Sequence, residues 1–283
     1  MQQQQMSYGS DYHYLPVTSV ESGELHEAAP DVACYTVQIV NIGLIGAPGH
    51  SDWVLVDAGM PKSADRIIEA AEARFGKGSR PQAIILTHGH FDHVGAIIEL
   101  IEYWQDVPVY AHERELPYLT GQQSYPEQDP TVDSGLVAKM SPLFPIRPIQ
   151  LGGHVKALPT DGSIPNLPDW KWVHTPGHTP GHISLFRESD RFLIAGDAFV
   201  TVKQESLYKV FTQEQEINGP PKYLTTDWVL ARDSVRRLEA LKPSAAITGH
   251  GLPMKGPLLA DQLFILANEF DRIAIPEHGK YVH

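Results

Sequence analysis

The 283-residue sequence predicts an α/β fold, and two observations support this class. Short runs rich in Val, Ile and Tyr alternate with amphipathic stretches along most of the chain, which is the pattern of layered α/β proteins. A chain of this length can bury a large core, either as one large α/β domain or as two small ones. Because the same design of strands and helices continues throughout, we expect a single domain over residues 32–283. A flexible N-terminal tail and lead-in, residues 1–31, would precede it.

The first half of this domain contains a predicted hairpin followed by a βαβ pattern. Two β runs surround a turn of Gly and Pro, and the helix after them begins near Ser63 and ends at Gly76. The expected elements are strands at 32–45 and 53–57, a helix at 63–76, a strand at 83–86, a helix at 96–104 and a strand at 107–111.

The second half contains two irregular segments between further strands and helices. Residues 121–148 are rich in prolines and polar residues, with one short helix expected at 134–140. Loops of this length are uncommon and often functional, so this segment either covers a substrate, contacts a partner, or is a tolerated surface excursion. The other expected elements are strands at 154–158, 170–173, 183–186, 192–195 and 245–248, helices at 227–241 and 258–273, and a second irregular segment at 201–224.

Composition excludes several classes of protein. A net charge of −12 argues against a nucleic-acid-binding surface, and the single cysteine, Cys34, excludes an intrachain disulfide and a cysteine-rich zinc module. No stretch approaches the roughly 18 apolar residues of a membrane helix, and the N-terminus lacks a signal-peptide pattern. We therefore expect a cytoplasmic protein that acts on a small molecule, although removal of an export signal would leave the same pattern. The oligomeric state stays open; a homodimer is common for soluble enzymes.

The sequence Thr-His-Gly-His-Phe-Asp-His at residues 87–93 is the strongest functional signal. His88, His90, Asp92 and His93 lie within six residues, directly after the apolar run 83–86. His88 and His90 alternate like strand residues, so both can point to one side, and the other two follow as the chain turns. Imidazoles with one carboxylate suit zinc or a similar first-row divalent ion. A polar loop of unrelated histidines is the alternative, and the further ligand-like residues downstream argue against it.

Further candidate ligand residues lie in three later segments of the chain and in one earlier segment. The turn-rich loop 174–182 contains His174, His178 and His182 between two Pro-Gly pairs, which form tight turns. Asp197 and His250 each follow a short apolar strand, and Asp57 ends the strand at 53–57.

These motifs together resemble the metallo-β-lactamase superfamily. Asp57, the cluster from His88 to His93, His178, Asp197 and His250 match the five ordered motifs of that family over roughly residues 32–255. The resemblance implies a four-layer αββα sandwich with the metals at one edge of its two sheets.

Site roles follow from the same resemblance. It implies that His88, His90 and His178 hold one metal, that Asp92, His93 and His250 hold a second, and that Asp197 bridges the two. Asp57, and in one reading His174 and His182, would orient ligands; the other reading makes these two histidines ordinary loop residues. Two divalent ions, zinc first with iron or manganese as alternatives, would share a hydroxide that attacks a carbonyl or phosphoryl centre. Asp92 would handle the proton in catalysis.

Departures from the family patterns narrow the substrate class. Class B β-lactamases place Cys or Ser where Asp197 stands, and glyoxalase II enzymes add a basic C-terminal domain that this chain lacks. Quorum-quenching lactonases resemble the chain in His-Phe-Asp-His and in Thr-Pro-Gly-His-Thr-Pro-Gly-His, but they carry a tyrosine where Val200 stands. The resulting expectation is a binuclear hydrolase of small esters, lactones or thioesters, lactonase-like first. The alternatives are a glyoxalase II-like thioesterase, a β-lactamase, and an iron-dependent persulfide dioxygenase-like or non-hydrolytic member of the fold.

Substrate specificity is expected from apolar residues near the motifs. They either line a pocket or pack the irregular segments, and the sequence does not choose between these readings. The candidates are Phe91, Tyr125, Phe144, Phe199, Val200, Tyr208 and Phe211.

Overall fold

The computed structural model describes residues 5–105, 107–203, 207–213 and 215–282. The chain divides into two compact units. Unit 1 comprises residues 1–17, 21–125 and 145–168, and unit 2 comprises residues 18–20, 126–144 and 169–283. The single domain expected for residues 32–283 stays a prediction. Parts of the expected N-terminal tail and of the second irregular segment, residues 1–4, 204–206 and 214, lie outside the described residues.

Unit 1 is built on a seven-stranded sheet in the order β1-β2-β3-β4-β5-β6-β7. Strands β1 to β4 pair antiparallel, and β4 to β7 pair parallel, which is the βαβ arrangement expected from the sequence. Because β4 and β5 are parallel, their carboxyl ends lie at the same edge of the sheet. The strands are β1 (Leu25–Ala29), β2 (Val32–Val37), β3 (Val40–Ile45), β4 (Val54–Val56), β5 (Ala83–Ile85), β6 (Val109–Ala111) and β7 (Val155–Ala157).

Two features of this sheet differ from the sequence expectation. The run 32–45, expected as one strand, is the hairpin β2–β3, whose turn has Gln38 at φ 58°. The Gln38 side chain donates hydrogen bonds to the carbonyls of Leu15 and Val17, at 2.8 and 2.7 Å, which holds the turn from outside the hairpin. Strand β1, Leu25–Ala29, lies within residues 1–31, the expected tail and lead-in, and the sequence analysis did not predict it.

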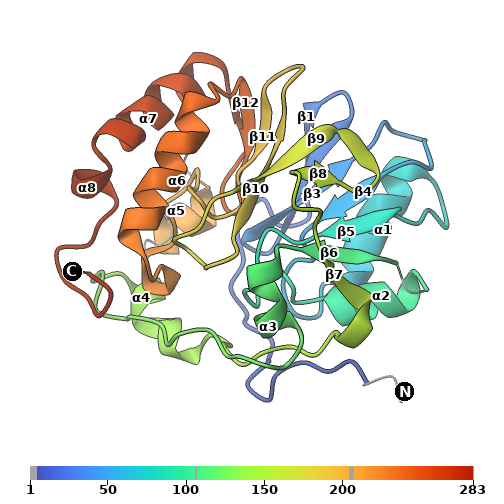
Figure 1. The fold of residues 1–283 in the computed structure, drawn as a ribbon, viewed down its shortest axis with the longest axis horizontal. Helices are drawn as coiled ribbons and strands as arrows, with labels where there is room; N and C mark the ends of the chain where they lie inside the picture. The colour runs from blue at the N-terminus through green and yellow to red at the C-terminus, as the bar shows by residue number, and fades with distance from the viewer. Residues whose placement is uncertain (1–4, 106, 204–206, 214, 283) are drawn as a thin grey trace. The chain divides into compact units, whose positions relative to one another are not determined.

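Helices α1 (Ala64–Phe75) and α2 (Ile97–Tyr103) belong to unit 1 and lie near the bounds that the sequence predicts (Figure 1). Phe75, at the end of α1, stacks on Trp53 with ring centroids 4.5 Å apart. Trp104, after α2, meets Trp53 edge-on at 5.6 Å. This aromatic cluster anchors both helices beside the start of β4. The remaining helical turns of the unit are η1 (Glu113–Glu115), α3 (Leu116–Leu119) and η3 (Gly152–His154).

A six-stranded sheet in the order β13-β12-β11-β10-β9-β8 provides the framework of unit 2. Its strands are β8 (Ser163–Ile164), β9 (Leu167–His174), β10 (Ile183–Arg187), β11 (Phe192–Ile194), β12 (Ala245–Ile247) and β13 (Met254–Lys255). The boundary between the units falls inside β9, so β8 is among the residues of unit 1. β9, β10 and β11 pair antiparallel in turn, whereas β11 and β12 are parallel. The end of β9, the start of β10 and the ends of β11 and β12 therefore share one edge.

Unit 2 contains five α-helices among the described residues. They are α4 (Leu136–Met140), α5 (Leu207–Thr212), α6 (Trp228–Ala240), α7 (Gly256–Asn268) and α8 (Phe270–Ile273), with 3₁₀ turns η2 (Ser141–Leu143) and η4 (Lys222–Leu224). Residues of α6, α7 and α8 contribute to an apolar core of unit 2 that includes Phe199, Trp228, Val235, Leu263 and Phe270.

The sequence gives no sign of α5, and the helix expected at 258–273 is interrupted at Glu269, which leaves the helical conformation at φ −115° and ψ 24°. Among the described residues, no helix is both long and apolar enough to cross a membrane.

Candidate metal centre

In unit 1 the metal-ligand motif is organised by one buried carboxylate, that of Asp57. Asp57 follows β4, adopts φ 63°, and is 3% exposed; aspartate tolerates this left-handed conformation better than most residues. One carboxylate oxygen accepts the backbone N–H of Thr87 at 2.7 Å. The other accepts the Thr87 hydroxyl at 2.7 Å and Nδ1 of His93 at 2.8 Å. Asp57 thus holds both ends of the 87–93 loop.

These contacts assign the tautomers of two histidines. Asp57 accepts from Nδ1 of His93, so this ring carries its proton on Nδ1 and presents Nε2 as a ligand nitrogen. The Thr87 hydroxyl donates to Asp57, so its oxygen accepts Nδ1 of His88, 3.1 Å away. His88 therefore also presents Nε2. Both rings are fully buried.

His90 and Asp92 complete this half of the donor set. Nitrogen and carboxylate ligand atoms lie within 4.8 Å of one another in the pairs His88–His90, His88–His93 and Asp92–His93. The strand β5 ends at Ile85, so the four ligand residues lie in the loop beyond it and not in an extended strand. The loop, and not strand alternation, brings the side chains together.

In unit 2 the expected ligands lie at one edge of the sheet. His178 is in the connection between β9 and β10, Asp197 follows β11, and His250 follows β12. The carboxylate oxygen Oδ2 of Asp197 lies 3.5 Å from Nε2 of His178 and 3.3 Å from Nε2 of His250. All three residues are 2% exposed. The sheet register therefore gathers two imidazoles around one carboxylate.

The loop that carries His178 is fixed against α6. Gly177 has φ 132°, and a Cβ there would lie 2.3 Å from the backbone nitrogen of Ala231, so only glycine permits this approach. Ser234 donates to the carbonyl of Pro176 at 2.7 Å. The Thr225 hydroxyl donates to the Pro221 carbonyl, so its oxygen accepts Nδ1 of His178 at 3.1 Å. His178 thus presents Nε2, as His88 and His93 do.

His182 uses both ring nitrogens inside unit 2. The backbone N–H of Asp197 donates to its Nε2 at 2.9 Å, so Nδ1 carries the proton and donates to the Thr175 hydroxyl at 2.8 Å. That hydroxyl donates to Ser184, 3.1 Å away, which in turn donates to the Ala195 carbonyl at 2.9 Å. His182 therefore positions the backbone at Asp197 and offers no nitrogen to a metal in this arrangement.

His174 contacts the same loop from its other end. It is the last residue of β9 and is partly exposed, and its Nε2 donates to the Pro180 carbonyl at 3.0 Å. This contact closes the loop 174–182 around His178.

The seven apolar pocket candidates divide into buried and exposed side chains. Phe199 is fully buried in the apolar core of unit 2, so the structure assigns it to the core and not to a pocket. Val200 is 1% exposed and pairs through its backbone with Asn218. Tyr208 and Phe211, on α5, are 71% and 51% exposed. The other three, Phe91, Tyr125 and Phe144, are buried.

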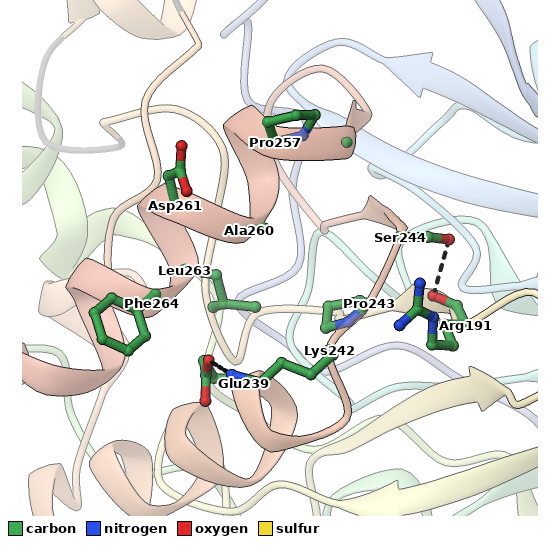
Figure 2. A pocket seen from close by; sticks show the side chains of 11 residues that line it. Arg191, Glu239, Lys242, Pro243, Ser244, Pro257, Ala260, Asp261, Leu263 and Phe264 are labelled. Atoms are coloured by element: carbon green, nitrogen blue, oxygen red, sulfur yellow. Dashed lines mark hydrogen bonds and ion pairs between the residues drawn. The ribbon is translucent and has the colours of Figure 1, made fainter.

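A pocket of about 520 Å³ opens elsewhere in unit 2, between α7 and the start of β12 (Figure 2). Arg191, Lys242 and Ser244 are among its lining residues, and no histidine is among them. Arg191 and Ser244 precede β11 and β12, whereas Asp197 and His250 follow these strands. This pocket is therefore at the opposite edge of the sheet from the candidate ligands.

The donor set fits first-row divalent metals. Five imidazoles and two carboxylates are borderline ligands that favour zinc, iron or manganese over calcium or magnesium. Three residues that support these ligands were missed by sequence reasoning: Thr87, Thr225 and Glu115, which accepts the N–H of Gly89. Thr87 adjoins the motif and could have been noticed, whereas Thr225 and Glu115 are 47 and 26 residues from the groups that they contact and carry no sequence signal.

Comparison with known proteins identifies the family. The model of the metallo-beta-lactamase superfamily matches residues 35–250. The probable metallo-hydrolase YflN of Bacillus subtilis (strain 168) is 54% identical over 262 residues, which cover 92% of this chain and 98% of YflN. The crystal structure of TTHA1623 in a di-iron-bound form is 27% identical with a TM-score of 0.52, covering 79% of this chain and 93% of that one.

A β-lactamase domain protein from Burkholderia ambifaria is 20% identical with a TM-score of 0.59, covering 92% of this chain and 80% of that one. At that identity the likeness concerns the fold alone. The expected α/β fold of the metallo-β-lactamase type is confirmed, and the chain belongs to the metallo-β-lactamase superfamily.

Proposed function

We propose that this chain is a binuclear metal-dependent hydrolase of small esters, lactones or thioesters, with lactones first. The observation that carries the proposal is that hydrogen bonds fix the tautomers of three histidines. His88, His93 and His178 each bond through Nδ1 to an oxygen of the protein, which leaves Nε2 as the ligand nitrogen. Metal-binding histidines are typically held in this way by carboxylates and other acceptors.

The proposed ligand assignment uses all seven donors. His88, His90 and His178 would hold one metal, and Asp92, His93 and His250 would hold the other. Asp197, which lies within 3.5 Å of two imidazoles in unit 2, would supply a carboxylate to both. When bound, two divalent ions lower the pKa of water toward neutrality and polarise the oxygen of a substrate carbonyl.

The residues of the chain have separate tasks in this proposal. Asp92 accepts and returns the proton of the attacking water through its carboxylate. Asp57 accepts a hydrogen bond from Nδ1 of His93 and so leaves Nε2 of this ring as the ligand nitrogen. His182 fixes the backbone N–H of Asp197 and thereby the direction of the bridging carboxylate.

Asp197 supports the choice of substrate class. A carboxylate at this position, where class B β-lactamases carry Cys or Ser, adds negative charge to the metal pair and disfavours β-lactam cleavage. The name of YflN, a probable metallo-hydrolase, is consistent with hydrolysis. We place zinc first, with iron as the alternative because TTHA1623 holds two irons.

The test combines metal analysis with a hydrolysis panel. Protein purified without chelator should hold close to two metal equivalents per chain. It should cleave an aryl ester or a γ- or δ-lactone faster than a thioester, a cephalosporin or a phosphotriester. Asp92→Asn should lower kcat by about a hundredfold or more, whereas Asp169→Asn, at an exposed position in β9, should leave kcat unchanged.

Two results would contradict the proposal. One is a metal content of at most one equivalent that added zinc, iron and manganese do not raise. The other is cleavage of the cephalosporin at a kcat/KM near 10⁶ M⁻¹s⁻¹, within the range of about 10⁴–10⁸ for enzymes on their own substrates, with no lactone or ester turnover.

A further inference from the structure

Gly89, between the two ligand residues His88 and His90, makes an unusual pair of contacts. Its backbone N–H points at two acceptors, a carboxylate oxygen of Glu115 and the hydroxyl oxygen of Tyr125, each 3.0 Å away. The Tyr125 hydroxyl in turn donates to the same Glu115 oxygen. The three groups form a closed set of hydrogen bonds on the peptide that joins the two histidines.

Both acceptors are buried and held from several sides. Glu115 is fully buried where η1 leads into α3, and Tyr125 is 6% exposed. The Tyr125 ring stacks on Tyr118 with centroids 4.0 Å apart and lies against the ring of His90 at 4.5 Å. The backbone N–H of Tyr125 donates to the Ile146 carbonyl at 2.9 Å. We call Glu115 and Tyr125, with their hydrogen bonds to the Gly89 N–H, the clamp; other residues of unit 1 hold it in place.

The Tyr125 hydroxyl stays protonated in this environment. Burial, with the Glu115 carboxylate beside it, raises the pKa of Tyr125 well above its ordinary value. Since the hydroxyl donates to Glu115 and accepts from Gly89, it is committed to the protein and not offered to a substrate. Of the two readings that the sequence left open for Tyr125, these contacts favour packing over lining a substrate pocket.

The close approach also explains why a glycine separates the two histidines. A Cβ on Gly89 would lie 2.6 Å from the Tyr125 hydroxyl oxygen and 3.0 Å from Cδ2 of Leu119. Any other residue would push the tyrosine away from the peptide. A buried carboxylate needs hydrogen-bond donors, so Glu115 in turn favours the one loop conformation that directs the Gly89 N–H toward it.

We propose that Glu115 and Tyr125 are positioning residues that set the affinity of the metal bound by His88 and His90. The inference rests on the proposed function, because it assigns these two histidines to a metal. The clamp fixes the plane of the His88–Gly89 peptide through its N–H group. Rotation of that plane would change the directions of the His88 and His90 side chains. Partners of this kind, one step removed from the metal, typically change metal affinity 10- to 100-fold when they are altered.

Tyr125→Phe and Tyr118→Phe form a matched pair for the test. The two rings stack on each other, and the Tyr118 hydroxyl accepts a long hydrogen bond, 3.4 Å, from Nε2 of Gln123. Zinc dissociation constants of the metal-free proteins are measured by competition with a chromophoric chelator. The absorption spectrum of the cobalt-loaded proteins reports coordination geometry, and thermal unfolding of the metal-free proteins reports folding.

Tyr125→Phe should raise one of the two zinc dissociation constants about tenfold and alter the cobalt spectrum. Tyr118→Phe should leave both within twofold of the wild type. Glu115→Gln, which keeps the side-chain volume, should shift the same dissociation constant in the same direction. This variant replaces Tyr125→Phe in the test if Tyr125→Phe does not fold.

Equal zinc affinities and identical cobalt spectra in folded Tyr125→Phe and Tyr118→Phe would overturn the inference while the wild type still binds two metals. A loss of thermal stability in Tyr125→Phe without any change in zinc affinity would overturn it as well, because the clamp would then only support the fold. A wild-type protein that binds no metal would overturn the proposed function and this inference together.

Discussion

Asp57→Asn is the most informative single change in unit 1. The carboxylate accepts three hydrogen bonds, from the Thr87 N–H and hydroxyl and from Nδ1 of His93. An asparagine amide has one oxygen and one NH₂ group. If the oxygen faces the Thr87 N–H, the NH₂ group faces two donors; if the amide is rotated, the NH₂ group faces the N–H instead. Either orientation breaks at least one bond in a site that is 3% exposed.

The magnitude follows from the number of bonds lost. Hydrogen bonds to a charged group contribute about 1.5–3 kcal/mol each, and burial leaves no water to replace them. We therefore expect Asp57→Asn to lower the unfolding free energy of the metal-free protein by about 2–4 kcal/mol. In the orientation that places the NH₂ group toward His93, that ring loses the acceptor that fixes its tautomer, and zinc affinity should fall by about 10- to 100-fold.

The assay uses urea unfolding of the metal-free protein and zinc competition with a chelator. Asp65→Asn is the control, because Asp65 is exposed in the first turn of α1 of the same unit. If Asp57→Asn unfolded at the same urea concentration as Asp65→Asn and bound zinc within twofold of it, the assigned role of the carboxylate would be refuted.

Three further changes test the surroundings of the ligands. Val200→Tyr should lower stability by about 1–3 kcal/mol through overpacking, because the side chain is 1% exposed; thermal unfolding checks this, and an unchanged Tm would show that the site has room. Gly177→Ala should destabilise the loop by its collision with α6, whereas Gly153→Ala, with no atom within 4 Å of the added Cβ, should not; equal Tm values would contradict this. Thr225→Val removes the acceptor for Nδ1 of His178, so zinc affinity should fall about tenfold; an unchanged dissociation constant would argue against the assigned tautomer.

The sequence predicted those parts of the fold whose signals are local. The helix α1 ends where Gly76 follows its apolar face, as expected, and β4, β5 and β6 are the parallel strands of the βαβ pattern. The turn at Gln38 was missed because no Gly, Pro, Asn or Asp marks it. Its positive φ is supported by the carbonyls of Leu15 and Val17, which are 23 and 21 residues away in the chain. A local pattern does not contain such contacts.

The candidate site shows the same division. His88, His93 and Asp57 could be proposed from the sequence because histidine and aspartate residues recur directly after short apolar strand runs. This pattern can be recognised without a structure. Thr225 and Glu115 were not found, since a threonine or glutamate has no distinctive spacing from the backbone or ring that it supports. For Phe199 the sequence left two readings open, because an aromatic residue after a motif has the same appearance whether it faces a cavity or the core, and the packing in unit 2 places it in the core.

The partners of the histidines explain how the protein prepares a site before a metal arrives. In unit 1 the carboxylate of Asp57 fixes His93 directly and His88 through the Thr87 hydroxyl. In unit 2 the Thr225 hydroxyl does the same for His178. In each of these three contacts the oxygen that accepts from Nδ1 belongs to the same unit as its histidine. In the proposed metal site, binding would require little reorganisation of these side chains, and affinity would depend on their supporting partners as well as on the ligands themselves.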